Sequence, residues 1–224
     1  MNDKSRLFAL IAMSAAAVSP VAARAQGAAG QVSPASVSGI LQPTAARGDS
    51  PVRQAPPDIK DKPNAPLRLR ASVSERMLYV SRGDSVIRMY DVAVGTDDYP
   101  TPKGAFRIRK IVWNPSWRPP DSKWAKDKTA KAPGDPENPM KVVKIFFKDP
   151  DYYLHGTDAE ASLGSAASHG CLRMAPDEVA ELAKMIMEHG GEPREENWFM
   201  RLLHFRRDEK VVYLRNPIAI EITG

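Results

Sequence analysis

The segment Ser168–Met174 reads SHGCLRM, and its Cys171 is the only cysteine in the 224-residue chain. One histidine, His169, stands two positions before this thiol, and another, His155, stands sixteen positions before it in the segment LHGT. A free thiol is mostly protonated at neutral pH, so a catalytic thiol needs a nearby base or positive charge. These residue types therefore indicate a cysteine–histidine site for acyl transfer.

Either histidine is a candidate for the base. Residues two apart in an extended segment point to the same side, so His169 and Cys171 can share a face. His155 lies at the end of a predicted strand and can instead approach the thiol from a neighbouring strand or loop. The sequence alone does not choose between the two.

The residues next to Cys171 suit a reactive thiol. Gly170 lacks a Cβ and permits a tight turn. The N–H groups of Gly170 and Cys171 are then expected to point into one pocket, where they would stabilise an oxyanion. Arg173 would add a positive charge that favours the thiolate or holds a substrate carboxylate, and a surface salt bridge is the alternative for this side chain.

A metal site is the rival interpretation, with His155, His169, Cys171 and His189 as ligands. The spacing lacks the paired short Cys/His clusters of metal sites, and His189 lies at the end of a predicted helix, where the helix dipole favours a cation. We therefore expect no metal. A thiol–disulfide role is disfavoured because the chain has no second cysteine.

The elements that must position these residues are mostly short strands. Segments rich in β-forming residues occur at 67–71, 77–80, 86–94, 105–113, 142–147, 152–155, 211–214 and 218–222. Turn residues separate them and leave little room for crossover helices in the first half of the domain. The pattern predicts a mostly antiparallel β domain rather than a doubly wound parallel sheet.

Two helices and one long loop complete the predicted domain. Pro176 suits a first helical position, and Gly190 supplies a stop, so a helix is expected between them. A weaker helical pattern covers 195–204, whose apolar residues could equally form irregular core. The segment 113–140 is rich in proline and tryptophan, and its Trp113, Trp117 and Trp124 are expected either to cover a groove or to fold onto the β core.

Residues 1–25 have the pattern of a cleavable secretory signal, with an early basic pair, an apolar stretch from Leu7 to Val18, and the ending Ala23-Arg24-Ala25. The apolar stretch is shorter than the ~20 residues of a membrane-spanning helix, so no stable membrane span is expected. We expect an exported protein of the periplasm or cell envelope. A single thiol is unusual there, because oxidising compartments favour paired cysteines or none.

Residues 26–66 are dominated by Ala, Pro, Ser and Gly, which predicts a disordered linker. Residues 67–224 are long enough for one domain with a core, and we expect a monomer. The net charge of +5 and the pI near 9.3 suit an anionic polymer such as a cell wall. No basic run is interleaved with aromatic residues, so nucleic acid is not an expected partner.

The folded part, from Leu67 to Ile222, resembles the L,D-transpeptidase catalytic domain of the YkuD family. The matching segments are MLYV, VIRMYDVAVG, YPTPKGAF at 99–106, NPSWRPP, LHGT at 154–157, SLG at 162–164 and SHGCLRM. The resemblance implies a mainly β fold, a sandwich or partly open barrel with one or two helices and a long Pro/Trp-rich loop.

The resemblance also implies a reaction. Cys171 would attack the peptidoglycan stem tetrapeptide between its third residue, a diamino acid, and the terminal D-Ala, forming a thioester and releasing D-Ala. A side-chain amine of a second stem would then complete a 3→3 cross-link, whereas water would give L,D-carboxypeptidase activity. Carbapenems would be expected to acylate the same thiol. A wall-binding protein with a silent site is the alternative from another class.

Residue by residue, the resemblance implies that His155 is the proton donor and acceptor and that His169 hydrogen-bonds near the thiol. His155 is favoured as the base, and both histidines stay candidates for that role. The set that would bind the oxyanion or the substrate comprises Gly170, Ser168, Arg173, Gly156 and Thr157. No cofactor is implied, because the thioester conserves the energy of the cleaved bond. The implied partners are stem peptides that act as donor and acceptor.

Overall fold

The computed structural model describes residues 53–54, 65–204 and 208–224, which lie in one compact unit, Arg47–Gly224. The predicted secretory signal at 1–25 and most of the predicted linker at 26–66 lie outside the described residues. Two residues of that linker, Arg53–Gln54, form strand β1 and pair with strand β4. Of the described residues, none belongs to a helix both long and apolar enough to cross a bilayer.

The domain is mainly β, as predicted. Its large sheet has nine strands in the order β1-β4-β3-β2-β11-β6-β7-β8-β10. The strands not yet given are β2 Leu67–Ser72, β3 Met77–Arg82, β4 Ser85–Asp91, β6 Gly104–Trp113, β7 Lys141–Lys148, β8 Tyr152–Gly156, β10 Leu172–Met174 and β11 Lys210–Thr223. A two-stranded sheet joins β5, Val94–Gly95, to β9, Ala166–Ser168.

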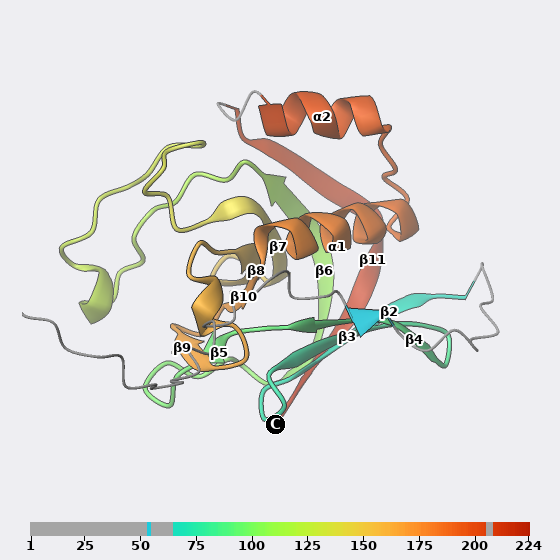
Figure 1. The fold of residues 1–224 in the computed structure, drawn as a ribbon, viewed down its shortest axis with the longest axis horizontal. Coiled ribbons are helices and arrows are strands. Elements are labelled where there is room, and N and C mark those ends of the chain that lie inside the picture. Colours follow the sequence, from blue (N-terminus) through green and yellow to red (C-terminus); the bar gives the residue numbers. More distant parts are fainter. Residues whose placement is uncertain (1–52, 55–64, 205–207) are drawn as a thin grey trace, which may run out of the picture. The chain divides into compact units, whose positions relative to one another are not determined.

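The large sheet nearly closes into a barrel. Ala93 follows β4, near one end of the strand order, and exchanges two backbone hydrogen bonds with Arg173 of β10 at the other end, with N···O distances of 3.0 and 2.9 Å. Helix α1, Pro176–His189, packs against β7, β8 and β11, as Figure 1 shows. Helix α2, Glu196–His204, follows it. Both predicted helices are therefore confirmed.

The expectation of two separate C-terminal strands is wrong, because both belong to the single long strand β11. This strand pairs antiparallel with β6 and parallel with β2, and its register against β6 shifts between Tyr213 and Ile218. Pro217 lies inside the shift and has no N–H to donate to a ladder. The proline therefore interrupts the alternation in the sequence without ending the strand.

The expectation of mostly antiparallel pairing holds for six strand pairs, and three pairs are parallel: β2–β11, β8–β10 and β5–β9. The strands β5, β9 and β10 are two or three residues long. A strand this short shows no periodicity in the sequence. The parallel pair β8–β10 was missed for that reason, and it is the pair that positions Cys171.

Trp113 belongs to the core, and the prediction that it could cover a groove is wrong for this residue. It is completely buried, and its Nε1–H donates to Met187 Sδ of α1 at 3.2 Å. Phe199 of α2 packs on its ring with a centroid distance of 5.3 Å. The aromatic residues of α2 therefore join the hydrophobic core as one face of a regular helix.

Glu178, in the first turn of α1, makes stability depend on pH. Burial, and then repulsion from Asp91 and Glu181, raise the pKa of its carboxyl from 4.5 to about 7. The native state therefore holds the proton more tightly than the unfolded chain, so this contribution to stability is present below pH 4.5 and is lost as the pH rises through 7.

We expect Glu178→Gln, which keeps the side chain neutral, to stabilise the protein at pH 8 by about 1 kcal/mol, or ~2–4 °C in Tm, after allowance for solvent screening. Thermal unfolding at pH 5 should show a much smaller gain. Glu188→Gln, at an exposed position of the same helix, is the control. Equal gains at both pH values would contradict the assignment.

Candidate active site

The turn that carries Cys171 is built by Ser168 and Gly170. Ser168 Oγ accepts a hydrogen bond from Gly170 N–H at 3.1 Å and donates one to Cys171 O at 2.5 Å. Gly170 has a φ of +103°, and a Cβ there would lie 2.8 Å from the Tyr152 ring and 3.3 Å from Pro100 O. The turn therefore needs glycine for both its backbone conformation and its space.

One of the two expected oxyanion donors already has a hydrogen-bond partner within the turn. The N–H of Gly170 is used inside the turn by Ser168, whose side chain is almost completely buried. Ser168 thus shapes the turn. The N–H of Gly170 would have to leave Ser168 Oγ to bind an oxyanion, whereas the N–H of Cys171 stays a predicted donor.

The parallel register of β8 and β10 aligns the candidate residues. Leu172 lies opposite Leu154, and Arg173 lies opposite His155. The two leucines are fully buried, so alternation directs His155 and Arg173 to the outer face of the sheet. The same register places Cys171 beside Tyr153.

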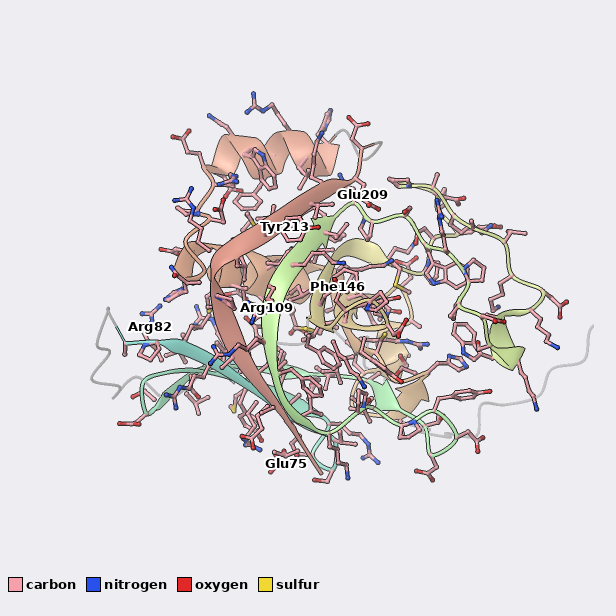
Figure 2. The ribbon with its side chains drawn as sticks, turned by 180° about the vertical axis from the view of Figure 1, so that it is seen from behind. Glu75, Arg82, Arg109, Phe146, Glu209 and Tyr213 are labelled. Atoms are coloured by element: carbon pink, nitrogen blue, oxygen red, sulfur yellow. The ribbon has the colours of Figure 1, made fainter. Side chains whose placement is uncertain are left out.

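The outer face of five neighbouring strands forms the floor of a cleft of about 1480 Å³. Paired residues of β8, β7, β6 and β11 form two parallel rows of side chains across the sheet. One row runs from His155 to Val211, and the other runs from Tyr153 to Tyr213. With Cys171 and Arg173, the floor comprises Tyr153, His155, Lys144, Phe146, Lys110, Val112, Val211 and Tyr213. Figure 2 labels Phe146 and Tyr213, which lie in the part of the floor beyond Tyr153.

Cys171 is partly exposed, and its thiol donates to Asp151 O at 3.5 Å. Burial raises the pKa of this thiol to about 11, and hydrogen bonds from the backbone and hydroxyl of Tyr153 oppose that shift. The charges of Lys144 and Arg173 oppose it as well. The thiol is therefore neutral at physiological pH, and its use as a nucleophile requires a base.

His155 is buried, and its Nδ1 lies 2.8 Å from Gly156 O. Because a carbonyl only accepts, Nδ1 carries the proton and Nε2 keeps a free lone pair. Burial first, and then the positive charges of Arg173 and Lys144, lower the pKa of His155 to about 4. The imidazole is therefore neutral at physiological pH and oriented by a third group, as a general base should be.

His169 is in a different environment. It is exposed, stacks on the Trp124 ring with a centroid distance of 4.0 Å, and lies 4.9 Å from the ring of Tyr99. Burial and the charges of Arg173 and Lys128 lower its pKa. Both histidines line the cleft with Cys171: His155 lies on its floor, and His169 packs against Trp124 of the segment between β6 and β7.

The remaining predicted residues have distinct places. Arg173 is half-buried on the cleft floor and forms no ion pair within the part of the chain that the structure describes, so the salt-bridge alternative is not observed. Gly156 is buried, and a Cβ there would lie 2.6 Å from Lys141 O. Thr157 Oγ1 accepts from Ala159 N–H at 3.1 Å, which holds the loop after β8.

The segment between β6 and β7 borders the cleft, and Figure 1 shows it extending beside the sheet. Trp117 and Lys131 exchange backbone hydrogen bonds that draw its two arms together, at 2.9 and 2.8 Å. Trp117 is buried. Trp124 lies in the short helix Lys123–Ala125, and its ring stacks on His169. The groove-covering expectation thus applies to Trp124.

Of the four residues in the rival metal interpretation, His189 lies apart from the other three. His189 caps the C-terminal end of α1, with its Nδ1 2.9 Å from Met185 O, and lines a different and smaller pocket. Within 53–54, 65–204 and 208–224, no three Cys, His, Asp or Glu side chains are grouped as metal ligands would be.

Two residues of the site were missed by the sequence analysis. Tyr153 lies beside Cys171 and opposes the rise in the pKa of the thiol, and Lys144 lies across from His155 in the neighbouring strand. Tyr153 stands two positions before His155 in the same strand, so both side chains point to the same face, and the sequence could have predicted Tyr153 as a site residue. Lys144 requires the register between β7 and β8, which no local pattern supplies.

A thiol and an oriented, neutral imidazole on the floor of one cleft are the arrangement expected of a cysteine–histidine acyl-transfer site. The chain belongs to the YkuD family, whose L,D-transpeptidase catalytic domain matches residues 66–211. The family resemblance seen in the sequence is therefore confirmed.

Curated relatives carry the same family description. The chain is 28% identical over 130 residues to the putative L,D-transpeptidase YkuD of Bacillus licheniformis, covering 58% of this chain and 66% of the relative. It is 36% identical over 114 residues to the putative L,D-transpeptidase YqjB of Bacillus subtilis, covering 49% and 60%. The chain thus spans less than two-thirds of the length of these relatives.

Solved structures with a similar chain path include an L,D-transpeptidase from Mycobacterium smegmatis, with 18% identity, a TM-score of 0.46, and coverage of 71% of this chain and 59% of that one. Another is the Ldtfm–avibactam carbamoyl enzyme, with 15% identity, a TM-score of 0.47, and coverage of 74% and 50%.

Proposed function

We propose that this protein is an exported, cysteine-dependent L,D-transpeptidase that forms 3→3 cross-links between peptidoglycan stem peptides. The observation that carries the proposal is the cleft floor, where the thiol of Cys171 lies with a neutral imidazole, oriented by Gly156 O, and the guanidinium of Arg173. The predicted secretory signal and the basic net charge of +5 suit work on an anionic wall outside the membrane.

The reaction has two halves. Cys171 Sγ attacks the carbonyl carbon between the diamino acid and D-Ala, and His155 Nε2 takes the thiol proton. The tetrahedral intermediate collapses, the C–N bond breaks, and the imidazolium gives its proton to the departing D-Ala amine. A thioester remains. An acceptor amine attacks this thioester, loses its proton to His155, and releases an amide and the thiol.

Substrate binding is proposed along the cleft floor. Five strands span roughly 19 Å from β10 to β11, enough for about five or six extended residues. Arg173 faces the cleft without an ion-pair partner among the described residues, so its guanidinium is free to hold a carboxylate of the donor stem.

The test supplies purified protein with a stem tetrapeptide and an amine acceptor and analyses the products by mass spectrometry. The proposal expects a cross-linked dimer together with released D-Ala. Release of D-Ala with only the free acid would instead identify a carboxypeptidase. Absence of both products, with wall sedimentation unchanged by Cys171→Ser, would overturn the proposal in favour of a silent wall-binding protein.

A further inference from the structure

Lys144 holds a positive charge beside the candidate nucleophile. It lies in β7 opposite His155 of β8, on the cleft floor, and it is partly buried. Its Nζ donates to Ser116 O at 2.9 Å and lies 4.9 Å from the centroid of the Tyr153 ring. It forms no ion pair with any residue that the structure describes. The ammonium is thus fixed between a carbonyl and an aromatic face.

The carbonyl that fixes Lys144 is itself held. Glu209 accepts hydrogen bonds from the backbone N–H and the hydroxyl of Ser116, at 2.7 and 2.9 Å. Glu209 stands just before β11, where Figure 2 labels it. These hydrogen bonds tie the loop after β6 to the residue that precedes β11. They therefore limit the positions that the Lys144 ammonium can take.

Tyr153 connects this charge to the thiol. The register of β8 and β10 places Tyr153 beside Cys171, and both line the cleft. The backbone N–H and the hydroxyl of Tyr153 favour the thiolate and so oppose the effect of burial on the pKa of Cys171. The ring is edge-on to His155 with a centroid distance of 5.6 Å, and Phe146 packs on it at 5.1 Å. Burial raises the pKa of the phenol, so the hydroxyl stays protonated and acts as a donor.

We propose that Tyr153 is a catalytic residue that stabilises the developing thiolate of Cys171, and that Lys144 is a positioning residue that strengthens this effect from above the Tyr153 ring. A cation over the ring withdraws electron density from the phenol and makes its O–H a stronger donor. The inference rests on the proposed function only in taking Cys171 as the nucleophile.

No proton passes through this pair. The thiol proton moves to His155 Nε2, and Tyr153 keeps its own proton throughout. The groups that face the thiol are Tyr153 and His155 from β8, Lys144 from β7 and Arg173 from β10. Burial lowers the pKa of Lys144, the charges of Glu209 and of the Cys171 thiolate oppose that shift, and the charge of Lys110 adds to it.

The test measures the thiol without any wall substrate. Cys171 is the only cysteine, so the neutral disulfide 4,4′-dithiodipyridine reports on it alone. In Lys144→Met and in Tyr153→Phe, the pH of half-maximal reactivity should rise by about one unit. The rate constant at pH 8 should fall about three- to fourfold, because a less acidic thiol is also more nucleophilic. Lys144→Arg should restore most of the rate.

Lys148→Met is the matched control. Lys148 lies in the same strand and also stands over a tyrosine, with its Nζ 5.4 Å from the Tyr152 ring, but it is exposed and outside the cleft lining. Its removal changes the net charge equally and should leave thiol reactivity unchanged. Thermal unfolding checks each fold, and Lys144→Gln replaces the Met variant if that one does not fold.

Wild-type reactivity in the Lys144 and Tyr153 variants would overturn the inference, and so would an equal loss in Lys148→Met. Lower reactivity in the Lys144 and Tyr153 variants, together with no cross-linking by the wild-type protein, would support this inference while refuting the proposed function. The two proposals therefore fail in distinguishable ways.

Discussion

Replacement of Cys171 by alanine is expected to reduce cross-linking and D-Ala release by roughly 10⁴-fold or more, the scale seen when a covalent nucleophile is removed. The thioester carries both halves of the proposed reaction, and the cleft floor offers no second thiol. The turn should survive, since it is held by Ser168 through the backbone of residues 170 and 171. Product formation and thermal unfolding are measured together.

Cys171→Ser tests whether activity needs the chemistry of the thiol or only a side chain of its size. A hydroxyl is nearly isosteric but a much weaker acid, so the serine variant should also lack activity while keeping the wild-type Tm within a few degrees. Intact-mass analysis with a carbapenem should show an adduct on the wild-type protein and none on either variant. Turnover that persists in Cys171→Ala would refute the nucleophile assignment.

Replacement of His155 by glutamine is expected to lower kcat/KM by about 10²- to 10⁴-fold, the usual contribution of a general base. The same change at His169 should cost less than about tenfold. The difference follows from their surroundings, because His155 is buried with its tautomer set by Gly156 O, whereas His169 is exposed against Trp124. A larger loss at His169 would transfer the role of base to it.

The pH profile of the wild-type enzyme tests the same assignment without a substitution. Burial lowers the pKa of His155 to about 4, so the neutral imidazole is lost only as the pH falls through that value. The acid limb of kcat/KM should therefore lie near pH 4. A limb at the ordinary histidine value, about 6.5, would contradict it.

The sequence predicted the elements that carry long repeating patterns. Alternation in β6 and β7 and the apolar face of α1 were recognised because each extends over several residues. Strands β9 and β10 were not predicted, because a strand of three residues is too short to show a repeating pattern of apolar and polar side chains. The division of β11 into two predicted strands has a local cause, Pro217, whose effect on the ladder is overcome by the neighbouring strands.

The sequence by itself determined the nucleophile candidate and the residue types around it, because Cys171 is unique and SHGCLRM places His, Gly and Arg within three positions of it. Only the tertiary structure showed that His155 and His169 have different environments and that Ser168 Oγ accepts the hydrogen bond of the Gly170 N–H. It also showed that Lys144 and Tyr153 lie near the thiol. These outcomes depend on the register between β7, β8 and β10. Register is fixed by the packing of the whole sheet around its core rather than by the local chain.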